Sequence, residues 1–173
     1  MTPDAFAEAV VATPPRCVGS FTTAPYRLGA FDEGASVGFK LGCRRCGGAR
    51  FAFSEVTSHW SNGAEQAQDA VGLIATCSKC AAPAPLFNAV HDGYDGELGH
   101  LKFMQGPATV AALANASDVE AMVLFTYNTS PAELAPLAAE AAVRPQDLFD
   151  WFTLQVRADS GQPFQQIWDY ECA

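Results

Sequence analysis

The stretches Cys43-Arg44-Arg45-Cys46 and Cys77-Ser78-Lys79-Cys80 decide how this chain is expected to fold. Each places two residues between its cysteines, a spacing that lets both sulfurs of a tight turn face one ion. Two such turns complete a tetrahedron of thiolates, the ligand set of structural zinc sites, with Zn–S distances of about 2.3 Å. The sequence therefore predicts one structural zinc ion, and its ligands are Cys43, Cys46, Cys77 and Cys80.

The segment around these cysteines resembles the zinc ribbons, small β-hairpin sites in which two knuckles hold one zinc ion. Residues 39–88 carry the resemblance, with Gly47 after the first cysteine pair and Ala81 at the same place after the second. Thirty residues separate Cys46 from Cys77, more than the roughly 15–20 usual for this pattern. We therefore expect a loop inserted between two zinc-bound hairpins. Zinc ribbons serve many processes, so the resemblance implies a metal and little about function.

Two other interpretations of the cysteine pairs stay open at this point. A redox dithiol favours a helix N-terminus, where a thiolate is stabilised, whereas glycines and a predicted strand follow Cys46. The third interpretation is that all four cysteines are core residues without a ligand. Cys17 and Cys172 lie outside the pattern, and we interpret them as small buried apolar residues.

Length and composition predict one globular domain over residues 1–173, containing the zinc-ribbon-like segment at 39–88. A hydrophobic content of 49% argues against a disordered chain. No apolar run approaches the roughly 18 residues that cross a bilayer, so we expect a soluble protein without membrane contact. Asp4 and Glu8 stand where a secretory signal needs bases, which indicates a cytoplasmic location. Thiols are kept reduced there, and this favours metal ligands over disulfides.

The residue pattern predicts an α+β fold with a mixed or antiparallel sheet, zinc-ribbon-like hairpins, and two or three helices mainly in the C-terminal half. Strands are expected at 50–56 and 71–76, next to the two cysteine pairs, with a helical turn at 64–70 between them. The alanine-rich stretch 107–116 predicts a helix. A strand is favoured over residues 119–127, although Ser117 with Glu120 also fits the start of a helix.

Capping signals predict helices at both ends of the chain. Thr2 followed by Pro3 indicates a short first helix, and Ser130-Pro131 indicates a longer one that Pro145 ends before starting another short helix. Two strands are expected after it. Residues 152–164 also match 39–51 at five apolar, arginine and glycine positions, which suggests a third knuckle without cysteines. Chance similarity explains these matches equally well.

The net charge of −9 is unevenly distributed, because residues 81–173 hold twelve acids and three bases. Such a surface repels the phosphates of nucleic acids and membranes, so we expect another protein as the partner and nucleic acid as an unlikely one. One basic cluster surrounds the cysteines. It is either a contact patch or, the interpretation we favour, compensation for the net charge of about −2 that a zinc ion carries with four thiolates. The cluster comprises Lys40, Arg44, Arg45, Arg50 and Lys79.

A polar loop over residues 91–100 is the remaining candidate site. Imidazoles and carboxylates together can bind a catalytic metal or perform acid–base chemistry. The spacing fits no known metal loop, however, and the interspersed glycines favour a solvated structural turn. The candidate residues are His91, Asp92, Asp95, Glu97 and His100.

No nucleophile elbow, phosphate-binding loop or dinucleotide fingerprint occurs in the sequence. We therefore favour a zinc-stabilised intracellular binding or adaptor protein, or an immunity-type regulator, that engages another protein through an acidic surface. The alternative is a metal-dependent enzyme that uses the 91–100 loop. A nucleic-acid-binding zinc ribbon is the third hypothesis.

Overall fold

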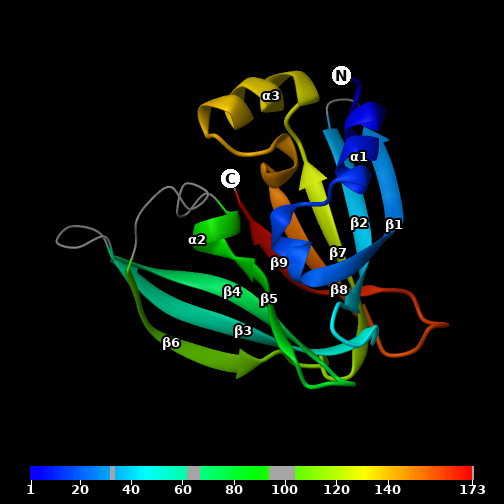
Figure 1. The fold of residues 1–173 in the computed structure, drawn as a ribbon, viewed down its shortest axis with the longest axis vertical. Helices are drawn as coiled ribbons and strands as arrows, with labels where there is room; N and C mark the ends of the chain where they lie inside the picture. The colour runs from blue at the N-terminus through cyan, green and yellow to red at the C-terminus, as the bar shows by residue number, and fades with distance from the viewer. Residues whose placement is uncertain (32–33, 62–66, 94–103, 173) are drawn as a thin grey trace.

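A strongly bent antiparallel sheet in the form of a half-barrel is the centre of the fold (Figure 1). The computed structural model describes residues 1–31, 34–61, 67–93 and 104–172. The α+β class is confirmed, and the strand pairs of the described residues are all antiparallel. The strands are β1 (Phe21–Phe31), β2 (Gly34–Cys43), β3 (Arg50–Ser61), β4 (Ala67–Cys77), β5 (Pro83–Asn88), β6 (Met104–Ala112), β7 (Val119–Tyr127), β8 (Trp151–Arg157) and β9 (Gln165–Glu171).

The sheet divides into two lobes that meet at β7. One edge of β7 pairs with β2 over residues 122–127 and with β3 only at Val119 and Glu120. Its other edge pairs with β8, which in turn pairs with β9. We call β1, β2, β7, β8 and β9 the first lobe. The second lobe consists of β3, β4, β5 and β6, in which β3 is flanked by β4 and β6.

The helices are α1 (Pro3–Ala12), α2 (Ala89–Asp92) and α3 (Pro131–Glu140), with 3-10 turns η1 (Arg16–Ser20) and η3 (Pro145–Asp147). Thr2 caps α1 by accepting a hydrogen bond from the N–H of Ala5 at 3.3 Å, and α1 packs on β1 and β2. Two of the three helices, α2 and α3, lie in the C-terminal half as expected, whereas the longest helical region, residues 3–20 with α1 and η1, is N-terminal. No helix in the described parts of the chain is long and apolar enough to span a bilayer.

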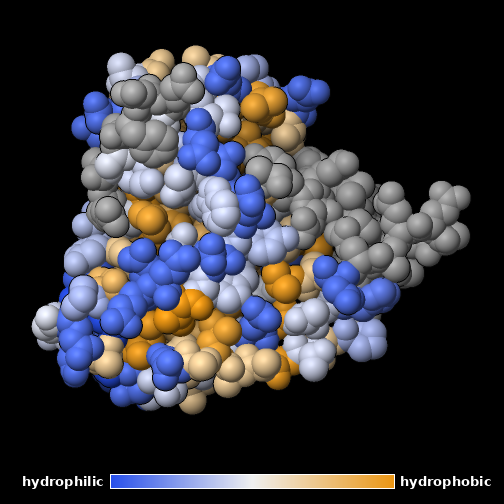
Figure 2. Space-filling model, turned by 180° about the vertical axis from the view of Figure 1, so that it is seen from behind, coloured by the Kyte–Doolittle hydropathy of each residue, from blue (hydrophilic) through white to orange (hydrophobic). Residues whose placement is uncertain are grey.

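The alanine-rich stretch 107–116 is not helical, which corrects the sequence prediction. Residues 104–112 form β6, whose backbone pairs with β3 from Ser54 to Ser61. This pairing outweighs the helix propensity of alanine, because tertiary hydrogen bonds override a weak local preference. Residues 107–112 are exposed. Seen from behind, the lower part of the molecule carries extended apolar areas (Figure 2).

Two further helix predictions need correction. The helical turn expected at 64–70 is replaced from Ala67 onward by β4, which pairs with β3 along its whole length; residues 64–66 lie outside the described residues. The short helix expected after Pro145 is only the turn η3. Strand β7 and helix α3 are confirmed, and Ser130 donates a hydrogen bond to the Glu133 carboxylate at 2.8 Å.

Aromatic side chains inside the half-barrel hold the two lobes together. Phe87 of β5 stacks on Phe152 of β8 with ring centroids 4.9 Å apart, and it meets Trp168 of β9 edge-on at 5.6 Å. The indole N–H of Trp168 donates a hydrogen bond to the Glu55 carboxylate of β3 at 2.7 Å. The lobes therefore share one buried core, although their backbones pair only briefly.

Candidate metal centre

The first knuckle, Cys43–Gly48, is closed by two backbone hydrogen bonds. The N–H of Gly47 donates to the carbonyl of Cys43 at 2.8 Å, and the N–H of Cys43 donates to the carbonyl of Gly48 at 2.8 Å. Gly47 has a φ of 69°, in the left-handed region that glycine occupies without a steric penalty. This tight turn returns the chain so that Cys46 lies beside Cys43.

The second knuckle, Cys77–Ala82, repeats the same pattern of hydrogen bonds. The N–H of Ala81 donates to the carbonyl of Cys77 at 2.8 Å, and the N–H of Cys77 donates to the carbonyl of Ala82 at 3.0 Å. Ala81 has a φ of 54°, so it takes the left-handed conformation that Gly47 takes in the first knuckle. The missing glycine therefore does not change the turn, although it strains the backbone.

The two knuckles bring their four sulfurs together. The sulfur atoms all lie within 4.8 Å of one another, with 3.7 Å between Cys43 and Cys80 and 3.5 Å between Cys46 and Cys77. A tetrahedral zinc ion with Zn–S bonds of about 2.3 Å separates its sulfurs by about 3.8 Å. The four-cysteine cluster therefore has the donor set and the spacing to hold one metal ion. It is the one such cluster among the described residues.

The thiols of the cluster differ in acidity because they share protons. Burial raises the pKa of Cys77, but backbone N–H groups of Cys80 and Lys79 and neighbouring thiols more than offset burial and lower it to about 7. The N–H of Gly48 lowers the pKa of Cys46, whereas burial and hydrogen bonds with the other three thiols raise it to about 12. In the absence of metal Cys46 therefore keeps its proton near neutral pH, whereas binding of a metal dication requires the thiols to lose their protons.

The knuckles also contact each other directly. The N–H of Ser78 in the second knuckle donates to the carbonyl of Arg50, just after the first, at 2.9 Å. A side chain at Gly48 would place its Cβ 3.2 Å from the Cys77 sulfur and 3.3 Å from the Cys46 sulfur. Gly48 thus permits the close approach of the two knuckles. Sequence reasoning did not identify this role, although the second glycine of the Gly47-Gly48 pair was the available signal.

The expected pair of zinc-bound hairpins is only half correct. The second knuckle joins β4 to β5, which are paired neighbours. The first knuckle joins β2 to β3, which both lie along the same edge of β7 and do not pair with each other. Lys40 pairs with Met122 and Arg50 pairs with Glu120. Only Ala121 lies between Glu120 and Met122 on β7. Residues 41–49 therefore leave the edge of β7 and return to it one residue further along, at the junction of the two lobes.

Most of the predicted basic cluster contacts the protein itself. Arg44 donates through Nε to the carbonyl of Phe21 at 3.1 Å, and Lys79 lies 3.5 Å from the carbonyl of Cys46. Arg50 donates to the carbonyl of Ala158 at 2.9 Å and pairs with the Asp118 carboxylate at 3.1 Å. Lys40 lies over the ring of Tyr26, 4.4 Å from its centroid. Arg45 is exposed on the first knuckle.

The predicted 91–100 loop is described only at its start, and Asp95, Glu97 and His100 lie outside the described residues. His91 is exposed and ends α2 together with Asp92. The Asp92 carboxylate accepts a hydrogen bond from the N–H of Asn88 at 2.9 Å and lies 3.7 Å from the guanidinium of Arg16. Asp92 therefore has a structural role in capping α2.

Residues 152–164 comprise most of β8 and the turn that leads into β9, and in this turn the N–H of Gln162 donates to the carbonyl of Asp159 at 3.0 Å. This turn lies beside the first knuckle, since Arg50 reaches the carbonyl of Ala158. The sequence match with residues 39–51 is not accompanied by the same strand pairing, because β8 and β9 pair with each other whereas β2 and β3 do not.

No protein-family model, curated protein or solved structure matches this chain.

The two knuckles offer a reciprocal test of backbone strain. Gly47→Ala should lower the free energy of unfolding by about 1 kcal/mol, because alanine disfavours positive φ. Ala81→Gly should raise it by up to about 1 kcal/mol, because it relieves the same strain. Denaturant unfolding of the metal-loaded protein measures both changes. Equal signs for the two substitutions would contradict the equivalence of the knuckles.

Asp92 predicts a pH dependence of stability. Burial raises its pKa from 3.8 to about 6, with Asp147 adding to the rise while Asn88 and Arg16 oppose it. The folded protein then binds this proton more tightly than the unfolded chain, so stability falls as pH rises from about 4 to about 6. Between about pH 4 and about pH 6, the free energy of unfolding of Asp92→Asn should therefore rise by roughly 2 kcal/mol relative to that of the wild type.

Denaturant unfolding at several pH values measures this gain, and Asp169→Asn, an exposed carboxylate on β9, is the control. A difference between wild type and Asp92→Asn that stays constant with pH would rule out the assignment.

Proposed function

We propose that Cys43, Cys46, Cys77 and Cys80 hold one structural zinc ion that fixes the junction of the two lobes. The observation that carries this proposal is the convergence of two equivalent knuckles on one set of four sulfurs within 4.8 Å. Four thiolates occupy every position of a tetrahedral ion, so no position stays open for water or substrate. A stabilising role therefore fits the site better than a catalytic one.

We further propose that the protein is an intracellular binding module, of adaptor or immunity type, that engages a basic partner protein. Helices α1 and α3 lie at the same end of the molecule (Figure 1), and both lack basic residues. Their acidic side chains are all exposed. We call this surface the acidic end, and its carboxylates are Asp4, Glu8, Glu133 and Glu140.

The acidic end also offers an apolar contact. Leu137 is 50% exposed, and it lies on α3 between Glu133 and Glu140 at helical spacings of four and three residues. A partly exposed leucine ringed by carboxylates resembles the usual anatomy of a protein interface, with an apolar centre and a charged rim. The carboxylates would steer a basic partner, and Leu137 would contribute the buried contact.

The zinc site predicts the behaviour of a ligand substitution. Cys80→Ser should abolish stoichiometric zinc binding and lower the free energy of unfolding by at least about 2 kcal/mol, because the two knuckles lose their common ligand. Cys17→Ala removes a thiol outside the cluster and should keep the metal. Elemental analysis and thermal unfolding measure both effects. Full metal content in Cys80→Ser would overturn the four-thiolate site.

The acidic end predicts a charge-sensitive partner. Tagged protein purified from its native host should retain a basic protein in stoichiometric amount, and Glu133→Lys with Glu140→Lys should release it. Asp169→Lys with Glu171→Lys makes the same charge change on β9 and should retain it. Mass spectrometry of the purified material identifies the partner. Recovery that is equal for both double variants would contradict this surface.

A further inference from the structure

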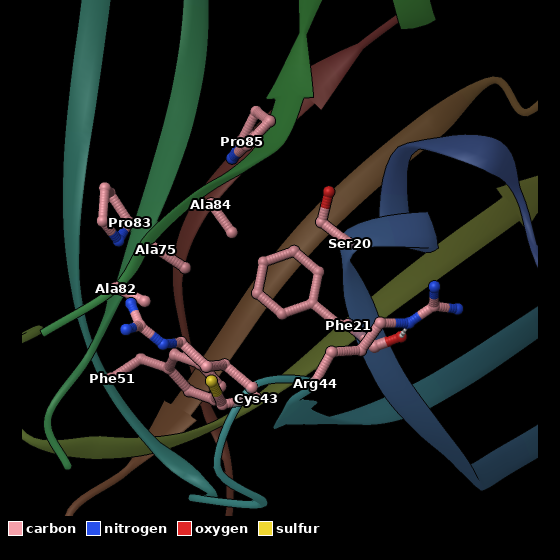
Figure 3. A pocket seen from close by; sticks show the side chains of 11 residues that line it. Ser20, Phe21, Cys43, Arg44, Phe51, Ala75, Ala82, Pro83, Ala84 and Pro85 are labelled. Carbon is pink, nitrogen blue, oxygen red and sulfur yellow. Dashed lines mark hydrogen bonds between the residues drawn. The ribbon is translucent and has the colours of Figure 1, made fainter. Parts of the chain in front are cut away.

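Two adjoining cavities run from the first knuckle to the loop after α1, and we call them together the arginine groove. The smaller has a volume of about 290 Å³ and lies between the first knuckle, the start of β1 and β5 (Figure 3). The larger has a volume of about 460 Å³ and lies between η1, its preceding loop and Arg144. Phe21 and Arg44 line both cavities, so the two adjoin at these residues.

The lining of the groove is rich in arginine, although the chain as a whole is acidic. Of the seven arginines in the sequence, Arg16, Arg44, Arg45 and Arg144 line it. None of the described residues that line the two cavities is acidic, although the chain has 19 acids and a net charge of −9. The predicted basic cluster is thus divided: two of its arginines join two arginines that are distant in the sequence.

Two of these arginines form ion pairs with largely buried carboxylates. The Asp147 carboxylate accepts two hydrogen bonds from Arg144, at 2.8 and 2.9 Å, and its side chain is only 5% exposed. Asp92, with its side chain 13% exposed, pairs with Arg16. Arg144 and Arg16 themselves remain more than 40% exposed. The guanidinium of Arg16 also donates to the carbonyl of His91. A carboxylate that binds one edge of a guanidinium fixes its orientation, and this places positive charge beside the groove.

Arg44 lies where the two cavities meet. Its Nε is bound to the carbonyl of Phe21, as the dashed line in Figure 3 shows. Within the described residues, its two terminal nitrogens have no partner among the hydrogen bonds and ion pairs of the protein. The guanidinium is therefore anchored at one nitrogen and can donate from the other two.

We propose that the arginine groove binds a small organic anion that carries two or more phosphate or carboxylate groups. Arg16 and Arg144 pair with carboxylates, whereas Arg44 and Arg45 have no carboxylate partner among the described residues. Arginine forks match the geometry of both kinds of oxyanion. The alanines and prolines of β5 and the ring of Phe21 form an apolar wall for the hydrocarbon part of the ligand. The concave shape favours a small ligand, since the surrounding acidic surface repels a nucleic-acid polymer.

The proposal can be tested on the metal-loaded protein labelled with ¹⁵N. Inorganic pyrophosphate and citrate are titrated separately at constant ionic strength. The changes in amide chemical shift that each anion causes are then compared. At least one should bind saturably and shift residues of the groove. Arg44→Gln and, independently, Arg45→Gln should each weaken that binding about tenfold, the loss expected for one charge-assisted hydrogen bond.

Lys40→Gln is the control, because it removes one positive charge from β2 outside the groove. It should leave the affinity within about twofold of the wild type. Pyrophosphate binding alone would identify a phosphorylated ligand, and citrate binding alone a polycarboxylate. Absence of saturable binding by both probes, or equal losses in Lys40→Gln and the arginine variants, would overturn the proposal. Zinc content measured in each variant separates loss of the groove from loss of the metal centre.

Discussion

The convergence of two knuckles on one set of sulfurs is the constraint on which the two-lobed fold depends. β7 and β3 pair at only two positions, and the chain leaves the edge of β7 for residues 41–49 before it returns. Such an excursion needs its own stabilisation, because it contributes few sheet hydrogen bonds. The hydrogen bond from Ser78 to Arg50 and the shared sulfurs supply it, while the aromatic contacts of Phe87 close the far side of the half-barrel.

Basic and acidic side chains lie in different parts of this fold. Bases cluster at the knuckles, where they satisfy carbonyl groups and offset negative charge on sulfur. Acids dominate α1 and α3 at the end of the molecule where these helices lie. Arg16 and Arg144, two of the four arginines that line the groove, pair with Asp92 and Asp147, so these ion pairs both fix the loops and place positive charge beside the groove.

The sequence allowed the four-cysteine cluster to be predicted, because the spacing of the cysteines is a local signal with a specific chemical meaning. Helix α3 and strand β7 were predicted for the same reason, from a capping serine with proline and from an apolar run. β6 was not, because its conformation depends on the edge of β3, about 50 residues away. The arginine groove was also missed, since Arg16 and Arg144 meet Arg44 only in three dimensions.

X-ray absorption spectroscopy at the zinc edge tests the central claim most directly. The four-thiolate centre predicts one zinc ion per chain with four sulfur neighbours at about 2.3 Å and no oxygen or nitrogen ligand. A first shell with fewer than four sulfurs, or purified protein without stoichiometric metal, would contradict the account, because the two knuckles would then not share one ion.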